Sequence, residues 1–172
     1  MPEDRTFLMG KFAAVLPGGL RYARNHMWCR PVGAASRAAL ESPARLAGPT
    51  EASRGRFGFT SYAIRLMQDM YFLDWQVSAG DRVELLQQIG HIETSKAVSD
   101  LFAPLAGTIL EFNPELLKDP SGINVDGYGA GWLFDMECAA ETLWNAEEYE
   151  RFLAENWEKT QRLIKGKINT ED

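Results

Sequence analysis

The stretch Glu93-Thr94-Ser95-Lys96-Ala97-Val98-Ser99-Asp100-Leu101-Phe102-Ala103-Pro104 is the most informative part of this sequence. It forms a polar kink between two apolar runs, 83–93 and 98–112, which are interrupted by Gly90 and Gly107. Short apolar runs separated by small turn residues are typical of β-strands. We therefore predict a hairpin with Lys96 on its turn. We expect the two glycines to permit bulges or a close approach of strands, and we assign neither a ligand.

Lys96 is the candidate functional residue. A lysine on a surface usually serves only solvation, and its pairing with a nearby carboxylate such as Glu93 or Asp100 is worth about 0 to 1 kcal/mol. A Schiff-base nucleophile needs burial or a cationic neighbour to lower its pKa. Lys96 lies instead among polar residues and two carboxylates, so that role is disfavoured. An amine held on a tight turn is better suited to modification by another enzyme.

The surroundings of Lys96 resemble the attachment stretch of a known family, the H protein of the glycine cleavage system, which reads roughly Glu-Ser-Val-Lys-Ala-Ala-Ser-Asp. The matching residues are Glu93, Lys96, Ala97, Ser99, Asp100 and Pro104. Residues 21–30 look like the family's Tyr-x-x-x-His-Glu-Trp-Val, and 57–63 look like its Val-Gly-Ile-Thr-Asp-x-Ala. Downstream, 113–133 follow the family's Asn-to-Gly-Trp pattern without a gap. A resemblance over about 21–152 is far more specific than a lone motif.

The resemblance implies a mainly β protein with the barrel-sandwich hybrid fold of lipoyl and biotinyl carriers, a short internal helix and a C-terminal helix. It implies a non-catalytic carrier with lipoate covalently attached to Lys96, which shuttles an aminomethyl group. The implied partners are a lipoate ligase or lipoyltransferase, glycine decarboxylase, aminomethyltransferase and dihydrolipoamide dehydrogenase. Biotin carriers share the architecture, but their turn typically reads Met-Lys-Met, whereas Ser95 and Ala97 flank the lysine here. Lipoate is therefore preferred over biotin.

Three departures from the family keep other functions open. Met27 replaces the acid of His-Glu-Trp, Leu86-Gln87-Gln88 replaces a Lys-Gly-Asp/Glu turn, and 31–56 form an inserted loop rich in Ala, Arg, Ser, Gly and Pro. One alternative is an H-like lipoate carrier of another pathway, such as sulfur oxidation or lipoyl relay. The other is an unmodified interaction module. The match of Glu93, Lys96, Ala97, Ser99 and Asp100 to the attachment stretch argues against this alternative.

Local signals predict two helices and the strands around them. Thr60 can cap a short helix over 63–67. Asn145 and Glu148 have the spacing of a capping box, and apolar residues then recur at helical period. We therefore predict a C-terminal helix over 146–164, followed by a fraying tail.

Strands are predicted at 70–75 and 132–136, and Trp28, Trp75 and Trp132 are expected in the core. The glycine-rich segment 127–131 is interpreted as a turn, because the Lys-Ser/Thr of a phosphate loop does not follow it.

Composition favours one domain over 1–172, because 45% hydrophobic content in a chain of this length can build a core. The net charge of -6 is unevenly distributed. Residues 1–66 contain ten Lys and Arg against four Asp and Glu, and 67–172 contain eight against twenty. Such polarity can steer encounters with charged proteins, whereas nucleic-acid binding is not expected of an acidic chain with scattered basic residues.

Two distant cysteines, Cys29 and Cys138, suggest neither a disulfide framework nor a zinc site. His26 and Cys29 are three residues apart but lack further clustered ligands, so a packed histidine is expected and no metal. The chain has neither a long apolar run nor the pattern of a signal peptide at its start. We expect a cytoplasmic protein without a membrane partner.

Overall fold

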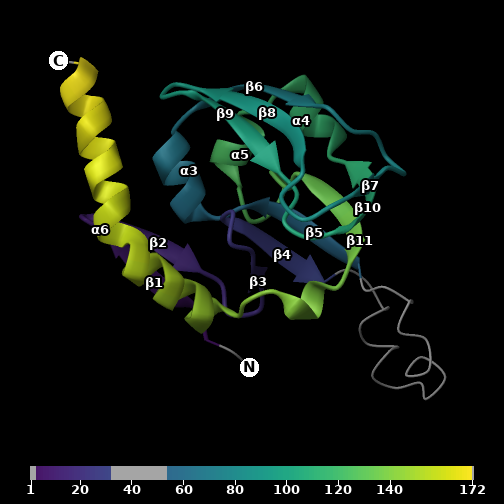
Figure 1. Ribbon diagram of the computed structural model, residues 1–172, viewed down its shortest axis with the longest axis horizontal. Helices are drawn as coiled ribbons and strands as arrows, with labels where there is room; N and C mark the ends of the chain where they lie inside the picture. Colours follow the sequence, from purple (N-terminus) through teal and green to yellow (C-terminus); the bar gives the residue numbers. More distant parts are fainter. Residues whose placement is uncertain (1–2, 32–53, 172) are drawn as a thin grey trace.

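The structure, a computed structural model, describes residues 3–31 and 54–171 (Figure 1). It is mainly β, with antiparallel pairing in every sheet. The strands are β1 Arg5–Met9, β2 Phe12–Leu16, β3 Arg21–Tyr22, β4 Met27–Pro31, β5 Arg54–Phe59, β6 Met70–Trp75, β7 Arg82–Val83, β8 Gln88–Thr94, β9 Val98–Phe102, β10 Gly107–Phe112 and β11 Phe134–Cys138. The helices are α3 Ser61–Met67, α4 Pro114–Lys118, α5 Gly122–Val125, the 3-10 turn η1 Ala140–Thr142 and α6 Ala146–Glu171.

Two sheets enclose the main core. One has the strand order β3-β4-β5-β11-β10-β7, and the other has the order β6-β8-β9. Buried side chains from both sheets meet between them, among them Ile89, Ile92, Phe57, Phe134 and Ile109. Burial of such side chains contributes about 1.5 to 3 kcal/mol each, so this layer fixes how the two sheets sit together. The predicted barrel-sandwich architecture is confirmed.

A second core joins the N-terminal hairpin of β1 and β2 to helix α6. Phe7 on β1 packs edge-on against Trp157 of α6, with ring centroids 5.8 Å apart. Tyr22 of β3 stacks on Tyr149 of the same helix, with ring centroids 4.7 Å apart. Figure 1 shows α6 running along this hairpin and then projecting past the body of the molecule. The apolar stripe predicted on the C-terminal helix therefore serves packing.

The helix caps follow their sequence signals. The Thr60 hydroxyl accepts a hydrogen bond from the Ala63 amide at 3.2 Å and begins α3. Before α6, the Asn145 side chain accepts from the Glu148 amide at 2.8 Å, and the Glu148 carboxylate accepts from the Asn145 amide at 3.0 Å. This reciprocal pair is the predicted capping box.

Gly90 and Gly107 lie where strands approach closely. A Cβ atom on Gly90 would stand 2.4 Å from the Asp74 carbonyl oxygen, and one on Gly107 would stand 2.1 Å from that of Glu137. A register shift between Gln88 and Gly90 marks a bulge in the pairing of β8 with β9. The expected role of both glycines is confirmed.

Several predicted boundaries were wrong. The apolar run 83–93 is not one strand, because the chain turns after Val83 and β8 starts only at Gln88. The cause is local: Leu86 has φ 62°, which no strand tolerates. The β1–β2 hairpin was not predicted; its turn contains Gly10 at φ 65°.

The ends of the other predicted segments also differ. The inserted loop does not span all of 31–56, because Pro31 ends β4 and Arg54–Arg56 belong to β5. Its remainder, 32–53, lies outside the described residues. The strand placed at 132–136 runs from Phe134 to Cys138. Helix α6 continues beyond 164 to Glu171, because Gly166 is its only strong helix breaker and a single glycine costs only about 1 kcal/mol.

The three tryptophans divide between core and rim. Trp28 is fully buried, and its ring fills the space above Gly58, where a Cβ atom would stand 2.5 Å from it. Trp75 and Trp132 are only half-buried. The Arg56 guanidinium covers the Trp132 ring at 3.9 Å. Among the described residues, no helix is both long and apolar enough to cross a membrane.

Candidate functional site

Lys96 lies at the tip of the β8–β9 hairpin and is exposed. Glu93 pairs with Val98, and the Thr94 amide donates to the Ala97 carbonyl at 2.9 Å. Ser95 and Lys96 are thus the two residues of the turn. The predicted position of the lysine on a hairpin turn is confirmed, and the side chain can be reached from solvent.

The Thr94 hydroxyl closes this turn. It accepts from the Lys96 and Ala97 amides, each at 3.2 Å, and lies 3.2 Å from the Ala97 carbonyl, to which it donates. A threonine side chain that bonds backbone groups two and three residues ahead offers the chain a local turn in place of a ladder. The backbone on both sides of Lys96 is therefore fixed by a side chain.

The tip is also tied to the rest of the molecule. The Ser95 amide donates to the Asp69 carbonyl at 2.9 Å, and the Asp69 amide donates to the Ser95 hydroxyl at 3.2 Å. The segment around Asp69 is held in turn by Asn124, whose side chain donates to the Gln68 carbonyl at 2.8 Å and accepts from the Met70 amide at 2.9 Å. Lys96 therefore extends from a doubly anchored turn.

Glu93 and Asp100 flank the turn on the exposed side of the sheet. Asp100 accepts a hydrogen bond from the Gln88 side chain at 3.1 Å. In the described part of the chain, no ion pair joins Lys96 to Glu93 or Asp100. The Lys96 amine is thus not sequestered by its acidic neighbours.

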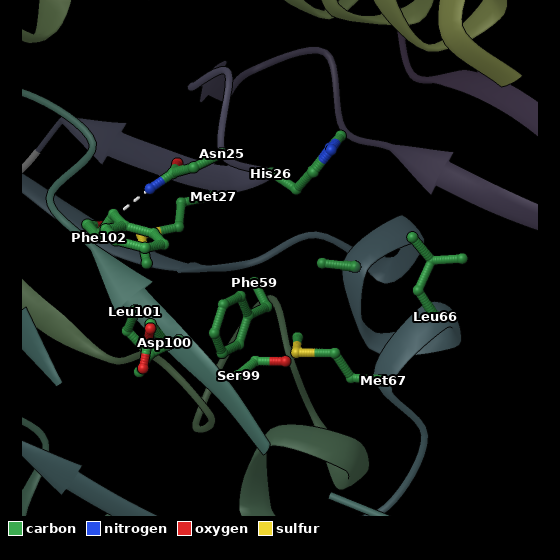
Figure 2. Close-up of a pocket in the computed structure, with 11 residues that line it drawn as sticks. Asn25, His26, Met27, Phe59, Leu66, Met67, Ser99, Asp100, Leu101 and Phe102 are labelled. Carbon is green, nitrogen blue, oxygen red and sulfur yellow. Dashed lines mark hydrogen bonds between the residues drawn. The ribbon is translucent and has the colours of Figure 1, made fainter. Parts of the chain in front are cut away.

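A hollow of about 160 Å³ lies beside the hairpin, between β9, helix α3 and the start of β4 (Figure 2). Its walls are mostly apolar and include Met27, Phe59, Met67 and Leu101. The Asn25 side chain donates a hydrogen bond from its Nδ2 to the Phe102 carbonyl at 2.8 Å and closes one end, as the dashed line in Figure 2 shows. This hollow can accept a slender apolar chain that reaches it along β9.

His26 is a packed histidine at the margin of this hollow. A hydrogen bond of 2.9 Å joins its Nδ1 to the Tyr149 hydroxyl, which is 3.0 Å from the Thr60 hydroxyl. Burial lowers the pKa of His26 to about 4, so the ring is neutral at neutral pH. The contact fastens α6 to α3 and β4.

The described His, Cys, Asp and Glu residues do not form a metal site or a reactive thiol. Among the described residues, no group of three or more His, Cys, Asp and Glu could hold a metal ion. Cys29 and Cys138 are both buried thiols, and burial raises the pKa of Cys138 to about 12. Both therefore stay protonated, and a protonated buried thiol is a poor nucleophile.

Thr94, Ser95, Asp69 and Asn124 position the candidate lysine, and sequence reasoning assigned none of them this role. Only the threonine carried a local signal, because a Thr two residues before the turn's end can bond its backbone. The Ser95–Asp69 contact joins residues 26 positions apart, so no short window of sequence contains it.

Comparisons with known proteins agree with this geometry. The family model described as "Glycine cleavage H-protein" matches residues 49–156. A protein of Carboxydothermus hydrogenoformans named "Glycine cleavage system H protein" is 30% identical over 84% of this chain and 99% of its own length. One of the same name from Bacteroides thetaiotaomicron is 36% identical over 78% of this chain and 94% of its own.

A solved structure has the same fold. The crystal structure of a glycine cleavage system H protein from Mycobacterium marinum matches with a TM-score of 0.61 and 31% identity, over 81% of this chain and 98% of that one. The matched family model covers the Lys96 hairpin, the hollow's walls on α3 and β9, and the start of α6. This chain therefore belongs to the glycine cleavage H-protein family, whose members are non-catalytic carriers.

Proposed function

We propose that this chain carries lipoate in amide linkage on Lys96 and moves a lipoyl-bound aminomethyl group between the enzymes of glycine cleavage. The observation that carries the proposal is the exposed position of Lys96 on a turn closed by Thr94 and anchored through Ser95. A carrier needs one accessible amine on a rigid support, because the support aims the arm and the arm supplies the reach.

The residues present fit this cofactor. Attachment requires the neutral Lys96 nitrogen to attack the carbonyl carbon of an activated acid; the activating group leaves, and the nitrogen loses one proton as the amide forms. The positive charge of the lysine disappears in this step. Lipoate supplies the redox and thiol chemistry when it is bound, while the protein sets reach and the choice of partners.

The chain's own residues can also shelter the arm. The apolar hollow is lined by Ser99 to Phe102 of β9, the strand that follows the turn. An arm that folds back there would remove apolar surface from water, which is favourable at about 25 cal/mol per Å². We expect a lipoate ligase or lipoyltransferase, glycine decarboxylase, aminomethyltransferase and dihydrolipoamide dehydrogenase as partners, and the cytoplasmic setting stays a prediction.

Intact mass tests the attachment. The protein produced in a host supplied with lipoate is expected to carry one mass increment of lipoyl size, and Lys96→Arg is expected to carry none. Lys118→Arg, at another exposed lysine, is the matched control and should keep the increment. An unmodified wild-type mass from such a host would contradict the proposal and favour the unmodified interaction module.

A second candidate function is favoured by Met27. This side chain is 1% exposed and lines the hollow, at the position where the family's His-Glu-Trp pattern has an acid. A thioether cannot pair with a charged amine as a carboxylate can. A lipoate carrier of another pathway, such as sulfur oxidation or lipoyl relay, would have less need for that acid.

Glycine–bicarbonate exchange separates the two candidates. The lipoylated protein is mixed with glycine decarboxylase and labelled bicarbonate, and incorporation of label into glycine is measured. Exchange that depends on Lys96 supports the glycine cleavage role. A lipoylated protein that supports no exchange, in an assay where an established H protein is active, assigns the chain to another pathway.

A further inference from the structure

A groove of about 260 Å³ lies at the end of the β8–β9 hairpin that is opposite to Lys96, where β9 ends (Figure 1). Segments that are distant in the sequence form it: the turn before β8, the turn between β9 and β10, the residues after β3, and the link from η1 to α6. We call it the far groove and define it by six of its lining residues: Arg24, Leu85, Leu86, Pro104, Leu105 and Trp144.

The far groove exposes large apolar side chains. Leu85 is 57% exposed and Leu86 is 48% exposed, and the half-buried Leu105 and Trp144 line the groove with them. A contiguous exposed apolar surface marks an interaction site on a soluble protein, whereas a single exposed leucine would not. The family's pattern has the charged turn Lys-Gly-Asp/Glu at this place, so the exposed leucines are a feature of this chain.

Leu86 is held in a backbone conformation that leucine rarely adopts. Its φ of 62° lies in the left-handed region, which glycine enters without strain. Two hydrogen bonds hold the turn: the Leu86 amide donates to the Ala103 carbonyl, and the Ala103 amide donates to the Gln87 carbonyl, each at 2.9 Å. Strained residues cluster at functional sites, so a leucine in this position indicates a role for its side chain.

The charge of the far groove comes from arginine. Arg24 is the only charged residue among the described residues that line it, and its guanidinium lies over the Trp144 ring, 5.8 Å from the centroid. Arg24 is exposed, and none of the ion pairs between described residues includes it. Glu84 and Glu141 are sequence neighbours of lining residues but do not line the groove. Arginine and tryptophan are the residue types that contribute most binding energy at protein interfaces.

These features define the chemistry of the partner. An apolar side chain that enters the groove removes the leucines and Trp144 from water, and a carboxylate beside it can pair with the Arg24 guanidinium through two hydrogen bonds. A second copy of this chain is disfavoured, because each copy has a net charge of -6 and like charges repel. We propose that the far groove binds an apolar segment of a partner protein, and that this segment carries Asp or Glu.

The position of the far groove leaves Lys96 free. Strand β8 has seven residues, and a strand rises about 3.3 Å per residue, so roughly 20 Å separate the groove from the hairpin tip. A protein that holds the chain at the groove therefore does not cover the amine. It keeps the tip at a high effective concentration near a second site. Only this use as a tether rests on the proposed function, because docking itself requires no lipoate.

Selection from a library of random peptides displayed on phage tests the proposal. The full-length wild-type protein is the target, and phage that also bind Leu86→Gly are discarded. We expect the retained peptides to combine Leu, Ile, Phe or Met with Asp or Glu. A selection that retains no peptide, or only peptides without Asp and Glu, overturns the docking site. The thermal midpoint of Leu86→Gly should equal or exceed that of wild type, because glycine accepts the positive φ.

The affinity of a retained peptide tests the apolar contact at a residue that the selection did not use. The peptide is labelled with fluorescein, and its binding is measured by anisotropy. We expect Leu85→Ser to weaken binding about tenfold or more, as loss of a central apolar contact does. Leu117→Ser, at a leucine that is 58% exposed on α4, is the control and should bind as wild type does. Equal affinity of the two variants contradicts the assignment of the groove.

A second pair of variants tests the charge. Arg24→Gln removes the positive charge from the groove, and Arg82→Gln removes one from an exposed position on β7. We expect peptide affinity in wild type to fall as salt rises, because salt screens exposed charges. Arg24→Gln should bind more weakly and lose most of this salt dependence, and Arg82→Gln should behave as wild type. Unchanged affinity in Arg24→Gln contradicts a carboxylate contact.

The remaining outcomes separate the docking site from other occupants and from the proposed function. A dimer of wild type in sedimentation that Leu86→Gly abolishes would assign the groove to a second copy and overturn the proposal. Lys96→Arg should bind the peptide as wild type does, and Leu85→Ser should be lipoylated as wild type is. Failure of lipoylation therefore leaves peptide binding intact, and failure of peptide binding leaves lipoylation intact.

Discussion

At the residue scale, the carrier role depends on how one amine is presented. Lys96 is exposed, and the side chain that fixes its backbone is its neighbour Thr94. The lysine's place on a turn was predictable, because polar residues interrupt two apolar runs there. The anchoring of Ser95 by Asp69 was not, because it depends on how β6 and β8 pair across the sheet.

Thr94→Val tests the closure of the turn. Valine keeps the shape of the side chain and removes the hydroxyl that bonds the Lys96 and Ala97 amides. We expect the free energy of unfolding to fall by about 1 to 2 kcal/mol, measured by urea denaturation, and lipoylation to slow. Thr108→Val, on strand β10, is the matched control. Lipoylation at the wild-type rate would show that the turn needs no closure by a side chain.

His26 makes stability depend on pH. Its pKa in the folded protein is about 4, below its ordinary value of 6.5, so the unfolded chain binds more protons between these values. Stability is therefore expected to fall as pH drops from 6.5 to 4, by up to about 3 kcal/mol at 1.36 kcal/mol per pH unit.

The measurement is urea denaturation at several pH values in wild type and His26→Asn. Asparagine tolerates the φ of 68° at this position and does not titrate. The difference in stability between the two proteins should narrow as pH falls through this window. A constant difference would mean that folding does not lower the pKa of His26.

At the element scale, local sequence signals predicted an element correctly where neighbouring residues alone determine where it begins. The Thr60 cap and the Asn145–Glu148 capping box were predictable because the hydrogen-bonding residues at each helix start lie within four consecutive positions. The strand predicted over 83–93 was wrong at its start because Leu85 and Leu86 are apolar, as strand residues often are, yet they lie exposed on a turn. Apolar character alone does not distinguish a buried strand from an exposed turn.

Gly90→Ala tests the close approach of β6 and β8. The added methyl group would stand 2.4 Å from the Asp74 carbonyl oxygen, a backbone atom that cannot move without disturbing the pairing. We expect a loss of about 1 to 3 kcal/mol in unfolding free energy. Gly19→Ala is the control, because a methyl group added there would meet no atom within 4 Å. Equal stability of the two variants would contradict the packing described for β8.

At the scale of the whole molecule, the two-sheet body supports the hairpin that presents the exposed amine of Lys96. The main core holds the two sheets together, and the second core fastens α6 to the N-terminal hairpin. The fold class and the carrier role followed from the sequence because motifs along most of the chain match one family. The second core could not be predicted from the sequence, because residues 5–16 and 146–157 meet only in the folded protein.

Tryptic mapping of protein from a lipoate-supplied host shows whether the arm is attached at Lys96. Trypsin cleaves after unmodified lysine but not after a lysine converted to an amide. We predict a peptide spanning 83–118, uncut at Lys96 and heavier by one lipoyl group, with fragment ions that place the increment on Lys96. Recovery of only the two unmodified peptides 83–96 and 97–118 would contradict the attachment.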